Sequence, residues 1–165
     1  MIQIEQCTNM DSEQIEVLFN ELIYEIIEET TGDPALFQIS DTKEIFKQGL
    51  HQGMLSVFKA VNENHQIIGF ISLCESYSLY ADGKFGIIQE LYVLNEYRSQ
   101  NIGKELLNIA IKFGQEKEWK RLEVCTPSIP EFERTLSFYQ NNGFEITGGK
   151  KLKILINLGV IHRRT

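Results

Sequence analysis

The chain has 165 residues, of which 42% are hydrophobic and 24% charged, a balance typical of globular proteins. Its net charge of −7 argues against nucleic acid or an anionic membrane as the main partner. No apolar run is long enough to cross a bilayer, and residues 1–5 lack the features of a signal peptide, so we expect a cytoplasmic location. The cysteines share no metal-ligand spacing, so we expect no metal site.

Hydrophobic periodicity predicts a chain of alternating helices and strands. Runs rich in β-branched and alternating apolar residues predict strands at 2–7, 54–61, 66–74, 86–94, 121–126, 144–147 and 152–158. Helical spacing and capping signals predict helices at 13–29, from Asp41, at 102–117, and from Pro130 to Asn142. Asp11 or Ser12 is suited to cap the first of these helices, and Asp41 with Glu44 has the spacing of a capping box. Gly143 is suited to a left-handed cap after the last helix.

This order of elements predicts an α/β (α+β) fold, a mostly antiparallel sheet with helices on both faces and a late strand-helix-strand unit. The sequence contains no internal repeat, low-complexity tract or linker. We therefore expect residues 1–165 to form a single domain.

The most informative segment is 90–107, where an apolar strand enters a short polar turn that opens directly into a helix. The start of a helix presents unpaired N–H groups and the positive end of the helix dipole, which favours anions. Gly103 allows close approach of a ligand to the backbone, and Asn101 tolerates a positive φ angle. Arg98 and Lys104 bracket the turn and are suited to contact a phosphate. A plain strand-to-helix turn with solvated charges is the alternative.

Two segments carry a family resemblance. Residues 97–107 resemble the acyl-CoA pyrophosphate signature Gln/Arg-x-x-Gly-x-Gly/Ala of the GNAT superfamily, the general-control-related N-acetyltransferases, with Asn101 where the first glycine is usual. Residues 136–144 resemble the Phe-Tyr-x-x-x-Gly-Phe segment in the last helix of that superfamily. Phe132 and Thr135 stand where family members often carry Asn and Ala, which puts in doubt a side-chain amide contact with the pantetheine arm.

The resemblance implies a GNAT-like mixed, largely antiparallel central sheet of about seven strands flanked by about four helices. It implies an acetyl-CoA-dependent N-acetyltransferase, with acetyl-CoA as cosubstrate and a primary amine of a small molecule or protein as the attacking group. A homodimer is compatible with it. A non-catalytic acyl-CoA-binding or regulatory domain of the same fold is the alternative. The resemblance places the acyl-CoA contacts at Leu91, Tyr92, Val93, Arg98, Ser99, Gln100, Asn101, Ile102, Gly103 and Lys104.

The same resemblance suggests catalytic roles. The strand around Val93 would splay from its neighbour, so that the Val93 N–H meets the thioester carbonyl. Tyr139 matches the tyrosine that often donates a proton to the leaving sulfur, although a core aromatic is the alternative. Glu90 lies in an apolar strand, where partial burial would suit it to accept a proton, or it forms a structural ion pair or faces solvent at the rim. Glutamates and an aspartate in the first helix and the loop after it either recruit a cationic amine or form a solvated face: Glu25, Glu28, Glu29 and Asp33.

Overall fold

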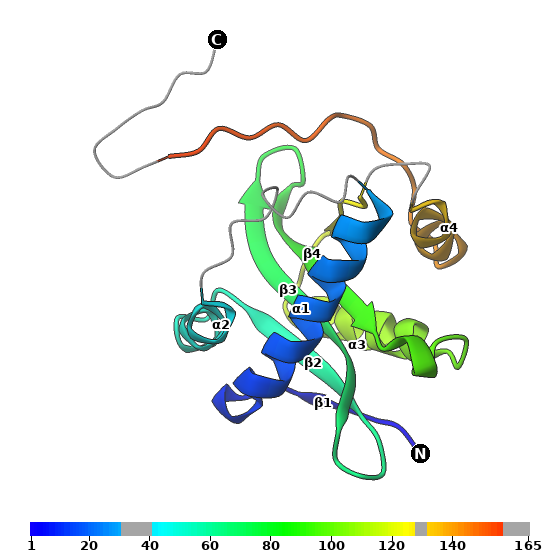
Figure 1. Ribbon diagram of the computed structural model, residues 1–165. Coiled ribbons are helices and arrows are strands. Elements are labelled where there is room, and N and C mark those ends of the chain that lie inside the picture. Colours follow the sequence, from blue (N-terminus) through cyan, green and yellow to red (C-terminus); the bar gives the residue numbers. More distant parts are fainter. Residues whose placement is uncertain (31–40, 128–131, 157–165) are drawn as a thin grey trace. The chain divides into compact units, whose positions relative to one another are not determined.

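The computed structural model describes residues 1–30, 41–127 and 132–156 (Figure 1). The chain divides into two compact units, residues 1–133 and 134–165, and each is described by itself. The first unit contains one five-stranded sheet with the strand order β1-β2-β3-β4-β5. Its helices and strands are β1 (Gln3–Gln6), α1 (Ser12–Glu29), α2 (Thr42–His51), β2 (Ser56–Val61), β3 (Ile67–Ser78), β4 (Gly83–Val93), α3 (Ile102–Glu116) and β5 (Leu122–Val124). None of the helices in these described ranges is long and apolar enough to cross a membrane.

The sheet is antiparallel from β1 to β4, and β5 then joins β4 in parallel. This arrangement confirms the prediction of a largely antiparallel sheet with a late strand-helix-strand unit. Helices α1 and α2 cover one face, where the cluster of buried residues includes Leu18, Phe46 and Phe70 (Figure 1). Helix α3 packs on β1 to β4 through the opposite face, with Leu106 and Ala110 completely buried. Because β-strand side chains alternate between faces, the strands supply both cores.

The helix starts follow the predicted positions, with one difference at α1. Asp11 occupies the N-cap position of α1, but its side chain makes no capping hydrogen bond there. Its carboxylate instead accepts hydrogen bonds from the Thr8 N–H at 2.9 Å and from Lys59 Nζ at 2.7 Å. Asp11 thus closes a short 3₁₀ turn and ties it to β2. At α2 the Asp41 side chain accepts from the Glu44 N–H at 3.3 Å, as its capping role requires.

The second unit contains α4 (Glu133–Asn141), which ends as predicted with Gly143 at φ 93°. The predicted start at Pro130 lies outside the described residues. The prediction of about seven strands is wrong in number, because the described residues 144–156 form no strand and the sheet has five. Alternating apolar residues are compatible with a strand, but a strand also needs a hydrogen-bonded partner, and the apolar side chains of 152–156 remain exposed.

Trp119 fixes the place where β4 meets β5. Its indole lies against Gly86 of β4 and Gly114 of α3, and its ring makes an edge contact with Phe113 at 5.4 Å between centroids. The indole Nε1–H donates to the Glu75 carboxylate at 2.8 Å. A side chain at Gly86 would overlap the indole ring, so this position of β4 needs a glycine for packing and not for its backbone angle.

We expect Gly86→Ala to lower the free energy of unfolding by about 1–3 kcal/mol, the usual cost of overpacking a core. Chemical denaturation followed by circular dichroism measures this change. In a Trp119→Leu background the ring that the new methyl group would meet is absent, so the cost of Gly86→Ala should be smaller there. An equal cost in both backgrounds would show that contact with the indole is not the cause.

Candidate active site

The candidate site is the end of β4, where this strand extends beyond β5. Pairing between the two strands extends from Gly86 opposite Leu122 to Ile88 opposite Val124, whereas β4 continues to Val93. Among the described residues, no strand pairs with this side of β4 beyond Ile88. The pairing ends where β5 ends, and the splaying of the two strands that we expected here stays a prediction. The end of the pairing leaves backbone groups of β4 facing an open edge.

The backbone of Val93 faces this open edge. In an antiparallel ladder, successive residues direct their N–H and C=O groups alternately toward and away from the partner strand. The Leu94 N–H donates to the Ile68 carbonyl of β3 at 2.9 Å, so Leu94 faces β3. Val93 therefore faces the opposite way, and its carbonyl accepts a hydrogen bond from Arg98 Nε at 2.9 Å. The Val93 N–H also points away from β3, toward the part of this edge of β4 that lies beyond the end of β5.

The turn after β4 opens directly into α3. Asn101 is the N-cap of α3 with φ 64° and ψ 13°, as its tolerance of the left-handed region predicts. Ser99 also has a positive φ, 64°. Asn101 makes no side-chain capping hydrogen bond, so its side chain does not satisfy the first N–H groups of the helix. Ile102 is buried and anchors the turn, while Lys104 is exposed beside the helix start. Backbone donors and a cation thus gather at one helix end, an arrangement suited to a phosphate.

Arg98, the other cation predicted for this turn, is directed away from the helix start. Its Nη2 donates to both carboxylate oxygens of Glu25 on α1, at 3.0 and 2.9 Å. Its guanidinium also lies 5.4 Å from the centroid of the Tyr92 ring. The Tyr92 hydroxyl donates to the same Glu25 carboxylate at 3.0 Å. Contact between Arg98 and a phosphate stays a prediction, because in this structure its partners are Glu25, Tyr92 and the Val93 carbonyl.

Glu90 lies on β4 beside an irregularity in the ladder. Ser72 opposes Glu90 and Leu73 opposes Ile88, which leaves Gln89 as an extra residue on β4. The hydroxyl of the buried Ser72 accepts from the Glu90 N–H at 3.0 Å. Burial raises the pKa of the Glu90 carboxyl, and a hydrogen bond with Ser72 acts in the opposite direction. Glu90 has no ion pair among the described residues, so the structural ion pair considered for it is not formed there.

Tyr139 belongs to the second unit, as the buried residue of α4. Its ring makes edge contacts with Phe138 and Phe144, with centroids 5.2 and 5.3 Å apart. Burial raises the pKa of its hydroxyl, so the group keeps its proton at neutral pH. The aromatic packing that we considered as an alternative is thus present, and it does not prevent the hydroxyl from acting as a proton donor.

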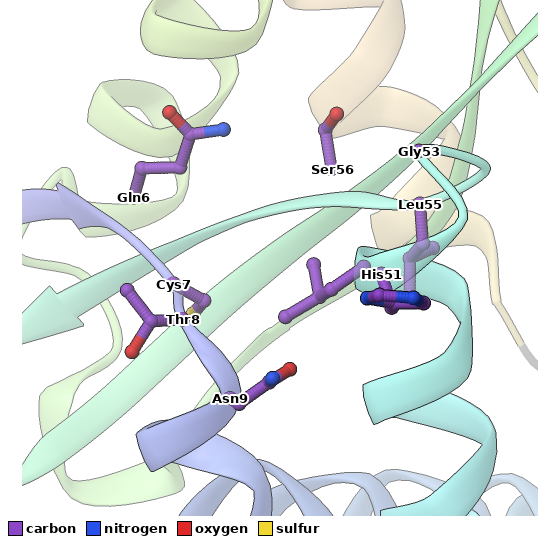
Figure 2. A pocket seen from close by; sticks show the side chains of 9 residues that line it. Gln6, Cys7, Thr8, Asn9, His51, Gly53, Leu55 and Ser56 are labelled. Carbon is purple, nitrogen blue, oxygen red and sulfur yellow. The ribbon is translucent and has the colours of Figure 1, made fainter.

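A separate open pocket of about 320 Å³ lies at the opposite edge of the sheet, among β1, β2 and the end of α2. Figure 2 shows Cys7, Thr8 and Asn9 on one side of it and His51 on the other. None of the predicted site residues lines this pocket. Burial raises the pKa of the Cys7 thiol to about 12, so this thiol is not a nucleophile at neutral pH.

Sequence analysis missed Ser72 as a neighbour of Glu90, and it missed the contact of Glu25 with Arg98. Ser72 places a hydroxyl group within an apolar run on β3. A small polar residue in such a run is a sequence signal that could have identified it as a candidate. Glu25 was considered only as one of several helix glutamates. Its bond to Arg98 joins residues 73 positions apart, and no local pattern in the sequence indicates that pair.

Comparison with known proteins gives a consistent answer. The family model described as "Acetyltransferase (GNAT) domain" matches residues 55–146. No sequence among the curated proteins matches the chain. Solved structures that share its fold include the following three. One is a ribosomal-protein-alanine N-acetyltransferase from Brucella melitensis biovar Abortus 2308, with 16% identity, a TM-score of 0.72, and coverage of 94% of this chain and 99% of the other.

The second is an aminoglycoside acetyltransferase from an uncultured soil metagenomic sample in complex with sisomicin, with 22% identity, a TM-score of 0.68, and coverage of 95% of both chains. The third is a transcriptional regulator from Bacillus halodurans C-125, with 18% identity, a TM-score of 0.71, and coverage of 94% of this chain and all of the other. Identities this low establish a common fold and no more. The family model, in contrast, spans more than half of the chain and includes β4, the turn after it and α3. The chain belongs to the GNAT acetyltransferase family.

Proposed function

We propose that the protein is an acetyl-CoA-dependent N-acetyltransferase that moves an acetyl group to a primary amine by direct attack. The observation that carries this proposal is the open edge of β4 at Val93, which leads directly into the start of α3. An extended pantetheine arm fits beside an unpaired strand edge, and a pyrophosphate fits at a helix start. The Val93 N–H would then stabilise the oxyanion of the tetrahedral intermediate.

The acyl-CoA contacts follow from this placement. The backbone of residues 91–93 would hold the pantetheine arm and the thioester. The N–H groups from Ser99 to Lys104 would hold the pyrophosphate, with the Lys104 ammonium adding charge. The positive φ at Ser99 and Asn101 supports this, because such a turn directs backbone N–H groups toward a common point. The Arg98 guanidinium, bound to the Val93 carbonyl, would act on the thioester end of this site.

Two side chains would carry out the two proton transfers that the proposed reaction needs. The nitrogen lone pair of the amine forms a bond to the thioester carbon, and the C–S bond then breaks. Glu90 would take the proton of the attacking amine, directly or through water, because burial raises its pKa toward the working range. Tyr139 would give a proton to the departing thiolate. Its raised pKa keeps that proton available at neutral pH.

The acceptor remains to be identified, and the structural neighbours suggest where to begin. One is an N-acetyltransferase for ribosomal-protein alanine and another binds an aminoglycoside, so peptide N-termini and aminoglycosides are the first acceptors to try. The exposed Glu28 and Glu29 near the end of α1 would favour a cationic acceptor. The Glu25 carboxylate is already bound to Arg98 and Tyr92, and Asp33 lies outside the described residues.

The first test is consumption of acetyl-CoA, followed as free thiol, with peptide N-termini, aminoglycosides, polyamines and amino acids, and with product masses recorded. We expect thiol release that depends on one class of amine, with a gain of one acetyl group in the product. Thiol release without an acetylated amine would contradict the proposal. Binding of CoA without any turnover would favour the regulatory alternative.

Tyr139→Phe should lower turnover by about 100-fold, the lower end of the range for general acid catalysis, and should leave acyl-CoA affinity within about twofold. Turnover numbers and CoA titrations of the purified variant measure the two quantities. Tyr77→Phe, which removes the same hydroxyl from an exposed ring, is the control and should behave as the wild type. Unchanged turnover in Tyr139→Phe would remove the proton-donor assignment.

Glu90→Gln tests the proposed base through pH dependence. Because burial raises the Glu90 pKa, the carboxylate forms only at a pH above the ordinary value of about 4.3, and activity of the wild type should rise through that raised pKa. The glutamine variant should be slower and should lack this ionisation in the profile of kcat/KM against pH. If the variant keeps the same rise of kcat/KM with pH, the ionisation belongs to another group of the protein or to the amine itself.

A further inference from the structure

Glu25 connects three elements of the first unit at the open edge of β4. It lies in the last turns of α1, and its carboxylate binds the Tyr92 hydroxyl of β4 and the Arg98 guanidinium in the turn before α3. Arg98 in turn donates from Nε to the Val93 carbonyl at 2.9 Å. An unbroken series of hydrogen bonds thus extends from α1 to the residue whose N–H faces the open edge.

Each bond in this series restricts the next one. Bonds from two different nitrogens, Nη2 to the Glu25 carboxylate and Nε to the Val93 carbonyl, define the plane of the guanidinium, and the Tyr92 ring 5.4 Å beneath it limits its position further. Tyr92 is itself buried, and its hydroxyl holds one oxygen of Glu25 in place. With the guanidinium fixed, its Nε holds the Val93 carbonyl at the side of β4 that has no partner strand. In a paired strand, the ladder would hold that carbonyl.

The same contacts contribute little to stability. The side chains of Arg98 and Glu25 are 41% and 38% exposed, and ion pairs with that much solvent access are weak. A group of weak bonds that converge on one backbone residue is better suited to orient that residue than to hold the fold together. Orientation has a functional meaning at Val93, because an oxyanion donor must be aligned before the reaction.

We infer that Glu25 is a positioning residue: through Arg98 it fixes the Val93 backbone, and so aligns the Val93 N–H for the thioester oxygen. This inference rests on the proposed function. Glu25 touches neither the acyl group nor the amine in this role. Its carboxylate acts as the anchor for Arg98, and Arg98 acts on the strand.

Glu25→Gln removes the charge and keeps the size of the side chain. We expect kcat to fall about tenfold, because a small misplacement of a reacting group is costly, while the dissociation constant for CoA stays within about twofold. The melting temperature should fall by no more than about 4 °C. Glu13→Gln makes the same charge change at an exposed position in the first turn of α1 and should match the wild type. If Glu25→Gln fails to fold, Glu25→Asp keeps the charge but shortens the reach, and should show the same loss of kcat.

Arg98→Gln supplies the second half of the experiment. Since Arg98 is the proposed intermediary, the double variant Glu25→Gln/Arg98→Gln should be no slower than Arg98→Gln alone. Additive losses would overturn the inference, as would a Glu25→Gln variant with unchanged kcat. An increase in the KM for the amine with unchanged kcat would also overturn it, and would make Glu25 an amine contact.

A measurement without turnover separates this inference from the proposed function. With ¹⁵N-valine labelling, the amide resonance of Val93 should shift in Glu25→Gln and stay in place in Glu13→Gln. A wild-type protein that acetylates no amine would contradict the proposed function, and the resonance would still report on the alignment. A Val93 resonance that is identical in all three proteins would overturn the inference alone.

Discussion

Every backbone N–H and C=O group in a protein needs a hydrogen-bond partner. Along the side of β4 that faces β5, the source of these partners changes at Ile88. Up to that residue β5 supplies the partners, and beyond it the described strands supply none. The protein meets the need in two ways. An arginine side chain takes the Val93 carbonyl, and the neighbouring N–H is left for something that is not part of the sheet. The candidate site follows from a difference in length between two adjacent strands.

The surroundings of this strand end are arranged to match. The turn that follows contains two non-glycine residues in the left-handed region, Ser99 and Asn101, which brings α3 back against the sheet within a few residues of Val93. Helix α1 reaches the same point from the other face of the sheet through Glu25. The opposite edge of the sheet, with its open pocket beside Cys7, shares none of these features. One end of one strand therefore concentrates backbone donors, a half-buried carboxyl group and a fixed guanidinium.

Local patterns in the sequence predicted most of the first unit. Helical spacing located α1 and α3 to within a residue or two, and the polar turn before Gly103 located the candidate site. The described residues 144–156 form neither of the two strands expected after Gly143, because alternation specifies which side chains share a face and not which strand will pair with them. The partner of Arg98 was not predictable, since the contact joins residues distant in sequence. The extra residue at Gln89 depends on register between strands, which composition does not encode.

The packing of Trp119 has a practical consequence for spectroscopy. It is the single tryptophan of the chain, half-buried over Gly86 at the first residue pair shared by β4 and β5. Its indole is held by Glu75 on β3 and by the ring of Phe113 on α3, so with Gly86 on β4 three elements determine its environment. Tryptophan emission from the native protein therefore originates at the junction where the two strands begin to pair. The fold carries its own optical reporter for movement at that junction, with no label attached.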